Sequence, residues 1–349
     1  MKRVVQILII AIVVIGGLVD GAPSDTTRTL LKDKINNVPS SAIYGLEDTY
    51  GNTMDCAKII QTFDTDVTKR YVAVYHYPWG GNYKVGIAKS SNLTTWQQTS
   101  LLEFGSSQAN IMRLSDGRYL MAWEQTYSSG NRIRLRYFLS LTDLLADHSD
   151  DWIEISIPSW VESGKAIGTP NIYTITGYSG NIYSSVLYVG AHYGSSNHDR
   201  QTSFKVTNFN KNQVEWLRNP NTYWPSIEDS VLYWLIPQQT SSSDGPGNVG
   251  GRDSFAYNGY QFALIEGNPW GTGTDSEDFK HWQSFLYDRQ TLNSDKLQLV
   301  TSCGATSYAN PHVTLLNDPN NVFVILLTFF IPTESVGCDA GTLLYWVPL

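Results

Sequence analysis

Short apolar runs of strand length alternate with polar, glycine-containing turns along most of the chain. The runs RYVAVYHY, RYLMAWEQ, SSVLYVGAHY, YQFALIEG and VFVILLTFF are rich in Val, Ile, Leu, Tyr and Phe. Runs of this length and composition are typical of buried β-strands. Turns at Asp116-Gly117 and Asn258-Gly259 precede two of the runs, and Asp-Gly and Asn-Gly are strong hairpin signals. The pattern therefore predicts antiparallel sheets.

The apolar runs belong to a unit that occurs five times. Each unit contains a tryptophan, and successive members are 56, 64, 66 and 64 positions apart: Trp96, Trp152, Trp216, Trp282 and Trp346. Each unit also opens with an amide or acid in front of a strand: Asp55, Asn110, Asn171, Asp253 and Asn310. One small sheet cannot bury both faces, whereas sheets packed around an axis can. We expect an all-β fold, a five-bladed β-propeller in a single domain, closed by pairing of the C-terminal strands with residues 40–50.

Composition excludes several classes of protein. Only 16 % of the 349 residues are charged, and 13 % are aromatic. Helical bundles and coiled coils need many Ala, Leu, Glu, Lys and Arg residues at helical spacing, so they are excluded. The net charge is −8 and there is no basic stripe, so nucleic acid is not an expected partner. The fivefold repeat replaces the two domains that length alone would suggest.

The first residues have the organisation of a secretory signal peptide. Lys2 and Arg3 precede an almost wholly apolar segment over residues 4–19, and small residues follow it. This segment is shorter than the roughly 20 residues of a membrane span, although an uncleaved anchor helix is the alternative. We predict a signal peptide over residues 1–21, a lead-in over 22–40 and the propeller over 41–349. The protein is then secreted and extracellular, monomeric, and without a membrane partner.

Secretion permits disulfide bonds. Of three cysteines, Cys303 and Cys338 lie in the last 50 residues, so we expect this pair to be bridged and Cys56 to be free, while other pairings stay open. Asn92 begins an Asn-Leu-Thr sequon and is a predicted glycosylation site. No cysteine or histidine spacing indicates a metal centre, and no cofactor is expected. The acidic and amide oxygens of the repeat openings suit a structural Ca²⁺ at most.

The run VAVYHYPWGGNYKVGIAKSSNLTTW, which ends at Trp96, resembles the first blade of the five-bladed glycoside hydrolases of family 43, the arabinanase and xylosidase group. Blades of that family typically end in Ser-x-Asp-Leu-x-x-Trp, to which SSNLTTW and SEDFKHW are loosely similar. The resemblance implies hydrolysis by an Asp general base, a pKa-tuning Asp and a Glu general acid on the innermost strands. Asp55 matches the base. Asn110 and Asn171 depart from the pattern, because acidic residues are expected there.

Glycoside hydrolysis needs two carboxyl groups that flank the scissile bond. Besides Asp55, the candidates are Asp253, Glu124 and Glu266. Asp253 follows a glycine-rich loop and Arg252, which would hold its carboxylate ionised; a purely structural ion pair is the alternative. Glu124 and Glu266 end apolar strands, and a partly buried carboxyl with a raised pKa suits a general acid. Exposed strand ends are the other interpretation.

Polar residues at the strand starts are expected to converge on the propeller axis as a substrate-binding ring. The candidate binding residues are Asn110, Asn171, Asn310, His312, His192, Arg252 and Trp270. Turn capping by Asn and a structural role for the histidines are the alternatives. Arg132, Arg134 and Arg136 alternate along one strand and so face one side, either as a carboxylate-binding cluster or as a solvated face.

These observations predict a secreted, carbohydrate-active propeller that hydrolyses a poly- or oligosaccharide with paired carboxylates. The main alternative is a glycan-binding, lectin-like propeller without catalysis, because the repeat openings are mainly amides. A protein-interaction propeller is a third possibility, since fold alone does not fix function. Hydrolysis requires Asp55 and one of the other acids to face the same funnel.

Overall fold

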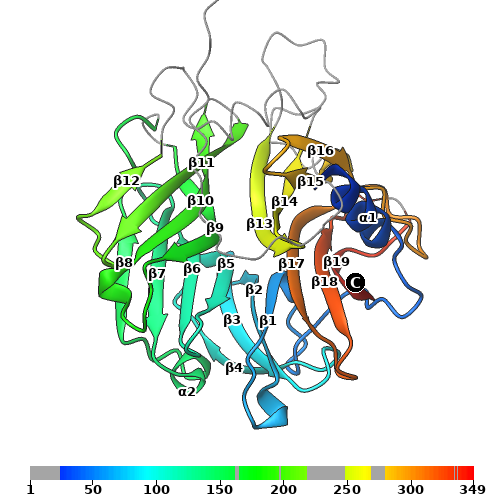
Figure 1. Cartoon of the computed structure of the whole chain (residues 1–349), viewed down its shortest axis with the longest axis horizontal. Helices are drawn as coiled ribbons and strands as arrows, with labels where there is room; N and C mark the ends of the chain where they lie inside the picture. Colours follow the sequence, from blue (N-terminus) through cyan, green and yellow to red (C-terminus); the bar gives the residue numbers. More distant parts are fainter. Residues whose placement is uncertain are drawn as a thin grey trace, which may run out of the picture.

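Five antiparallel sheets follow one another along the chain, and the strands of each sheet pair in sequence order (Figure 1). The computed structural model describes residues 24–161, 165–195, 198–217, 248–268, 280–333, 335 and 337–349. Each sheet is one blade, so the predicted all-β, five-bladed β-propeller is confirmed. The predicted signal peptide over residues 1–21 and the binding candidate Trp270 lie outside the described residues.

The blades have the following strands. Blade 1 contains β1 (Asp55–Gln61), β2 (Tyr71–Trp79), β3 (Asn82–Ser90) and β4 (Gln97–Leu101). Blade 2 contains β5 (Ser106–Arg113), β6 (Tyr119–Gln125), β7 (Arg132–Phe138) and β8 (Asp151–Ile155). Blade 3 contains β9 (Ile167–Thr176), β10 (Val186–Ser195), β11 (His198–Thr207) and β12 (Val214–Trp216). Blade 4 contains β13 (Val249–Tyr257), β14 (Tyr260–Gly267), β15 (Gln283–Asp288) and β16 (Asn293–Lys296). Blade 5 contains β17 (Ala309–Asn317), β18 (Phe323–Ile331) and β19 (Gly341–Pro348). The helices are α1 (Ser24–Asn36), η1 (Val67–Lys69), α2 (Leu141–Leu145) and η2 (Ile182–Ser184).

The two ends of the chain close the ring. The backbone of Ile43 exchanges two hydrogen bonds with that of Leu344, both 2.8 Å long, and the Leu46 N–H donates to the Thr342 carbonyl at 3.0 Å. The segment around residues 43–46 therefore completes blade 5 beside β19, and the predicted closure is confirmed. The lead-in contains α1, whose Leu31 side chain is fully buried in the core of blades 4 and 5.

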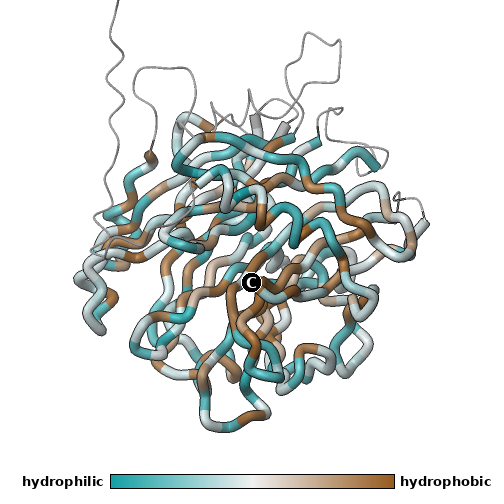
Figure 2. The backbone as a smooth tube through the Cα atoms, turned by 45° about the vertical axis from the view of Figure 1, so that its right-hand side comes forward, coloured by the Kyte–Doolittle hydropathy of each residue, from teal (hydrophilic) through white to brown (hydrophobic). Residues whose placement is uncertain are grey.

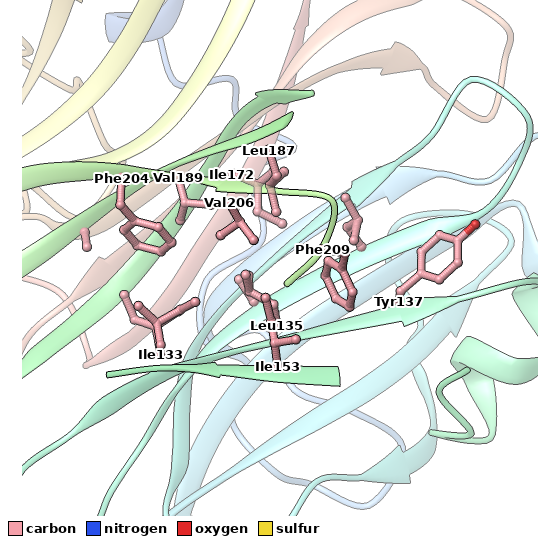
Figure 3. Packing of buried hydrophobic residues seen from close by; sticks show 14 of the residues in the cluster. Ile133, Leu135, Tyr137, Ile153, Ile172, Leu187, Val189, Phe204, Val206 and Phe209 are labelled. Atoms are coloured by element: carbon pink, nitrogen blue, oxygen red, sulfur yellow. The ribbon is translucent and has the colours of Figure 1, made fainter. Parts of the chain in front are cut away.

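Neighbouring blades bury their apolar faces against each other. Between blades 2 and 3, Ile133, Leu135 and Ile153 lie opposite Phe204 and Val206 (Figure 3). Hydrophobic stretches run through the interior of the sheets, whereas hydrophilic residues prevail in many connecting loops (Figure 2). Alternation along each strand thus places one set of side chains in an interblade core on either face.

Every innermost strand carries a β-bulge near its start. In blade 1, Asp55 pairs with His76 but Lys58 pairs with Val74, so two residues of β1 between these pairs oppose one residue of β2. The same shift occurs in the other blades, ahead of Asn110, Asn171, Asp253 and His312. Four bulges contain a residue with left-handed φ: Cys56 (54°), Gln108 (52°), Thr169 (50°) and Asn310 (48°). Bulges re-aim side chains, and here they turn one set of residues toward the axis.

Each blade has one of the five regularly spaced tryptophans, but their positions within the blades are not equivalent. Trp96 precedes β4, and Trp152 and Trp216 lie in the fourth strands β8 and β12. In contrast, Trp282 precedes the third strand of blade 4, and Trp346 lies within the third strand of blade 5. The regular spacing of the five tryptophans therefore does not reflect one shared position in the blade.

The disulfide between Cys303 and Cys338 is present, with its Cα atoms 5.2 Å apart, and Cys56 is buried and free. Asn92 lies in an exposed turn, where its Oδ1 accepts hydrogen bonds from the Thr94 and Thr95 N–H groups at 3.0 Å. Its glycosylation stays a prediction. Among the described residues, no helix has the length and apolar character that crossing a membrane requires.

Candidate active site

One position on each second strand faces the start of the innermost strand of its own blade. By register, these residues pair with Asp55, Ser107, Gly168, Gly250 and Ala309, which we call the pre-bulge positions; in blade 4 one further pair, Gly251 with Ile265, precedes the shift. They are His76, Glu124, His192, Glu266 and Phe330. All five line one cavity of about 570 Å³, to which every blade contributes. This volume falls in the range of roughly 300–1,000 Å³ that is usual for small-molecule sites. We call it the axial cavity.

Several of these side chains also hold the next blade. A bulge N–H donates to the side chain of the preceding blade in three cases: Thr169 to Glu124 Oε2 (3.0 Å), Asn310 to Glu266 Oε2 (2.6 Å) and Gln108 to His76 Nδ1 (3.2 Å). A bulge leaves a backbone donor without a ladder partner, and burial of such a donor is costly unless it is bonded. The ring of second-strand residues therefore joins the blades around the cavity.

Two glycines make room for this ring. A Cβ atom at Gly168 would lie 1.9 Å from Glu124 Oε2, and one at Gly250 would lie 1.7 Å from His192 Nε2. Only a residue without a side chain lets the carboxyl and the imidazole approach the neighbouring backbone so closely. Close packing of the cavity wall therefore requires glycine at these two positions.

Three acids from three blades meet at the axial cavity in different environments. Asp55 accepts a hydrogen bond from Thr53 Oγ1 at 3.1 Å through Oδ2, while its buried Oδ1 has no hydrogen-bond partner among the described residues. Glu124 accepts a hydrogen bond from the Asn131 amide through Oε1. Glu266 Oε1 lies 3.4 Å from Nη1 of Arg252. The acids are therefore brought together but differ in the charge and the donors around them.

These environments shift the pKa values of the three acids to different degrees. Burial raises the pKa of Asp55 to about 6, against a hydrogen bond from Thr53 that lowers it. Burial raises the pKa of Glu124 to about 7, which outweighs the donors at Thr169 and Asn131. Burial also raises the pKa of Glu266, while the Arg252 guanidinium opposes that rise. At neutral pH Asp55 is thus mostly ionised, whereas a large fraction of Glu124 is protonated.

The basic side chains at the axial cavity contribute little positive charge. Burial lowers the pKa of both His76 and His192 to about 3, so both are neutral at pH 7. Arg252 is 2 % exposed and donates to Gln108 Oε1 at 2.6 Å. Among the described lining residues it is the only Lys or Arg, against four acids: Asp55, Glu124, Asp199 and Glu266. The cavity is therefore acidic overall.

Asp253, a predicted catalytic residue, does not line the axial cavity. It is 2 % exposed, and its Oδ2 lies 2.6 Å from the Lys58 ammonium, accepts the Val313 N–H at 2.9 Å and lies 3.4 Å from His312 Nδ1. Burial alone would raise the pKa of Asp253, but Lys58 and His312 outweigh it and hold that pKa well below its usual value. Asp253 is part of a buried ion pair, and Arg252 pairs with Glu266 instead.

The prediction that the residues opening the five repeats form one ring is wrong, because these residues do not occupy equivalent positions in the strand register. Residues three places after the pre-bulge position are equivalent by pairing: Lys58, Asn110, Asn171, Asp253 and His312. Asp55 and Asn310 therefore do not belong to the ring that contains Asn110, Asn171 and Asp253. Each bulge adds a residue to the innermost strand, so alignment on the nearest Asp or Asn mixes two levels along the axis.

The predicted binding residues divide between these two levels. His192, Arg252 and Asn310 line the axial cavity. Asn110 lines a separate pocket of about 270 Å³ together with Lys58 and Asp253. Asn171 is fully buried and donates to Ser254 Oγ at 3.1 Å, and His312 is buried beside Asp253. Within the part of the chain that the structure describes, no group of three or more His, Cys, Asp or Glu side chains is arranged to hold a metal ion.

Several residues of the axial cavity were not among the predicted site residues. His76 and Glu124 occupy equivalent positions on the second strands of blades 1 and 2. Alignment of those two strands could therefore have identified His76 from Glu124. Asp199, Tyr83 and Trp282 also line the cavity. Asp199 is the second residue of β11, and no motif or period in the sequence singles it out.

No protein-family model and no curated protein sequence matches the chain. Solved structures similar to it include an endo-arabinase from Bacteroides thetaiotaomicron (12 % identity, 88 % of this chain and 97 % of that chain, TM-score 0.45). They also include a GH32 β-fructofuranosidase from Bombyx mori in complex with sucrose (12 %, 93 % and 68 %, TM-score 0.47). A third is an N-acetylgalactosamine deacetylase from F. plautii in complex with blood group B trisaccharide (11 %, 90 % and 92 %, TM-score 0.47). Such similarities do not identify a reaction, so the chemistry must follow from the cavity.

Proposed function

We propose that the protein hydrolyses glycosidic bonds of a neutral oligo- or polysaccharide in the axial cavity. The observation that carries the proposal is the convergence of Asp55, Glu124 and Glu266, from three different blades, on one cavity of about 570 Å³. A sphere of that volume is about 10 Å across, which suits two carboxyl groups separated by the roughly 6.5–9.5 Å of an inverting site.

Asp55 is the general base in this proposal. Its carboxylate lines the axial cavity and is mostly ionised at neutral pH, so it can take a proton from a water molecule there. Glu124 is the general acid, because its raised pKa keeps a proton available near pH 7. The water oxygen attacks the anomeric carbon, the bond to the leaving oxygen breaks, and Glu124 protonates that oxygen.

Glu266 has a third role. Its Oε1 lies 3.4 Å from the Arg252 guanidinium, which favours the ionised carboxylate and opposes the rise in pKa that burial causes. A fixed carboxylate stabilises the positive charge that develops on the sugar ring during bond cleavage. Arg252 partly offsets the negative charge of the Glu266 carboxylate. Its second contact, to Gln108, holds the guanidinium in place and so orients that carboxylate.

The charge of the cavity indicates the class of sugar. Four lining acids and one lining arginine repel a uronic acid, and the aromatic surfaces of Tyr83 and Trp282 suit an uncharged sugar ring. Arg132, Arg134 and Arg136, considered above as a carboxylate-binding cluster, all form salt bridges with acids, at Glu154, Glu103 and Asp147. They supply no binding site for an acidic sugar.

Release of reducing sugar from a panel of neutral polysaccharides tests this proposal. Asp55→Asn and Glu124→Gln each remove one ionisable group with little change of shape, and both are expected to lower kcat by about 100-fold or more. Glu215→Gln, at an acid of β12 whose side chain is 64 % exposed, is the matched control and should keep full activity. Equal sugar release by the wild type, Asp55→Asn and Glu124→Gln would refute the catalytic roles.

Glycan binding without cleavage is the second candidate function. It is favoured by one observation, that Glu124 and Glu266 each use Oε2 to hold the bulge of the next blade. In that case the same panel would show binding by the wild type and by Asp55→Asn alike, with no release of sugar.

We also propose that the protein is secreted, with residues 1–21 as a cleaved signal peptide, 22–40 as lead-in and 41–349 as propeller. The disulfide between Cys303 and Cys338 and the exposed turn at Asn92 support an extracellular location. Mass spectrometry of the secreted chain would give its first residue and would detect a glycan on Asn92.

A further inference from the structure

A second opening lies at the outer edge between blades 2 and 3, away from the axis. Its volume is about 610 Å³, and it shares no lining residue with the axial cavity. One wall is formed by β8, the edge strand of blade 2, with Trp152 and Glu154. The other is formed by Tyr183 of η2 and the turn at residues 208–212 between β11 and β12. We call this opening the interblade groove.

Two large aromatic rings are exposed in the interblade groove. Trp152 is 53 % exposed and Tyr183 is 48 % exposed, and they belong to different blades. Each ring is held by a neighbour: the Arg134 guanidinium lies 5.2 Å from the Trp152 ring centroid, and the Tyr183 hydroxyl donates to Asp151 Oδ2 at 3.2 Å. Rings that are anchored and yet exposed lose little conformational freedom when a ligand covers them.

The floor of the groove is rigid. Ile153 and Phe209 are buried at its base, and Figure 3 shows both within the interblade core beside Leu135 and Tyr137. Asn208 and Phe209 both have left-handed φ angles, of 58° and 46°, which is uncommon for a bulky residue. The Asn208 N–H donates to the Ser185 carbonyl at 2.8 Å, which fixes the turn against blade 3. The groove is therefore preformed.

Most polar groups of the groove suit an uncharged ligand. Arg132 of β7 is paired with Glu154 of β8 at 2.9 Å, so these two charges offset each other. The turn contributes three amides, at Asn208, Asn210 and Asn212, which both donate and accept hydrogen bonds, and one ammonium group, at Lys211. Exposed aromatic faces together with amides match the alternating apolar faces and hydroxyl groups of a sugar chain.

We propose that the interblade groove is a second carbohydrate-binding site, which holds a segment of a neutral polysaccharide between Trp152 and Tyr183. The choice of ligand class rests on the proposed function of the axial cavity. The site itself rests on the paired aromatics, the amide-rich lining and the rigid floor. It would keep a polymer on the protein while another segment of the same chain occupies the axial cavity.

Affinity electrophoresis of the full secreted chain tests the proposal, in gels that contain arabinan, arabinoxylan, mannan or mixed-linkage β-glucan. At least one polymer is expected to retard the wild type. The double variant Trp152→Ala/Tyr183→Ala should bind that polymer at least about tenfold more weakly. Tyr50→Ala, at a tyrosine that is 74 % exposed elsewhere, is the matched control and should be retarded like the wild type. Equal melting temperatures would show that the variants are folded.

The outcomes separate this site from the axial cavity. Asp55→Asn should be retarded as strongly as the wild type, whether or not the wild type releases sugar. If no sugar is released but the double variant loses retardation, the hydrolase proposal fails and the groove stands. Wild-type mobility that no polymer changes, or equal retardation of the double variant and the wild type, would overturn the groove. Binding of an extended peptide to the edge of β8 in place of every polymer would overturn it as well.

Discussion

Replacing Gly168 with alanine perturbs Glu124 without changing its carboxyl group. Gly168 lies in blade 3, at the start of β9, and its φ is outside the left-handed region. An alanine there adds no backbone strain. The added Cβ would lie 1.9 Å from Glu124 Oε2 and 2.6 Å from Cδ of the same carboxyl. The substitution therefore acts on the position of Glu124.

The size of the effect follows from that geometry. Ordinary contacts of a Cβ atom begin at 3.4 Å, so the carboxyl must move by about 1.5 Å, and a misplacement of about 1 Å can cost about 100-fold in rate. We expect kcat to fall about 100-fold or more, equivalent to about 2.7 kcal/mol of transition-state stabilisation. The hydrogen bond from the Thr169 N–H to Glu124 is lost as well, which costs about 1–3 kcal/mol of folding stability.

Steady-state hydrolysis of the best polysaccharide, with unfolding in urea measured in parallel, separates the two effects. Gly190→Ala is the matched control, because its Cβ would lie 2.1 Å from the Tyr173 hydroxyl, which lines the smaller pocket and not the axial cavity. It should lose stability but keep the kcat of the folded protein. A folded Gly168→Ala variant that turns over at the wild-type rate would refute the assignment of Glu124 as the general acid.

Three further predictions follow from the pKa values, the buried ion pair and the disulfide. Because Asp55 must be ionised and Glu124 protonated, kcat/KM should peak between about pH 6 and 7, and Glu124→Gln should lose the fall on the alkaline side; an unchanged profile would contradict these roles. Lys58→Met leaves Asp253 buried without its ammonium partner and should lower the free energy of unfolding at pH 7 by about 3–5 kcal/mol, measured in urea. In the wild type, the stability from Asp253 is fully present above its unfolded pKa near 4 and is lost as the pH falls, so the difference between the two proteins should shrink in acid; a constant difference would argue against the ion pair. Cys303→Ser opens a bridge with a sequence separation of 35 residues and should cost about 2–4 kcal/mol of stability while kcat is kept; a parallel loss of kcat in the folded variant would contradict the separation of bridge and cavity.

The sequence predicts the blades better than the site. Strand-length runs, Asp-Gly and Asn-Gly turns and a period near 60 residues are local signals, and they give the five sheets and the closure near Ile43. Glu124 and Glu266 end their strands in the sequence, and the structure places both at the cavity. The bulges are not visible in the sequence, because no single residue type marks them: Cys56, Gln108 and Thr169 share only a backbone conformation. Asp55 and Asp253 were expected to be equivalent, but the bulges place them at two different levels along the propeller axis.

The ring at the axial cavity shows why the two glutamates need an explanation other than folding. Its five equivalent positions hold His76, Glu124, His192, Glu266 and Phe330. His76 accepts a bulge N–H while it is neutral, and Phe330 has no acceptor in its side chain at all. Joining one blade to the next thus requires no acid at this position. A buried carboxyl nevertheless costs stability whenever it is ionised. Placing two of them at one cavity opposes folding, and the cleavage of a glycosidic bond is a reaction in which both acids would be used.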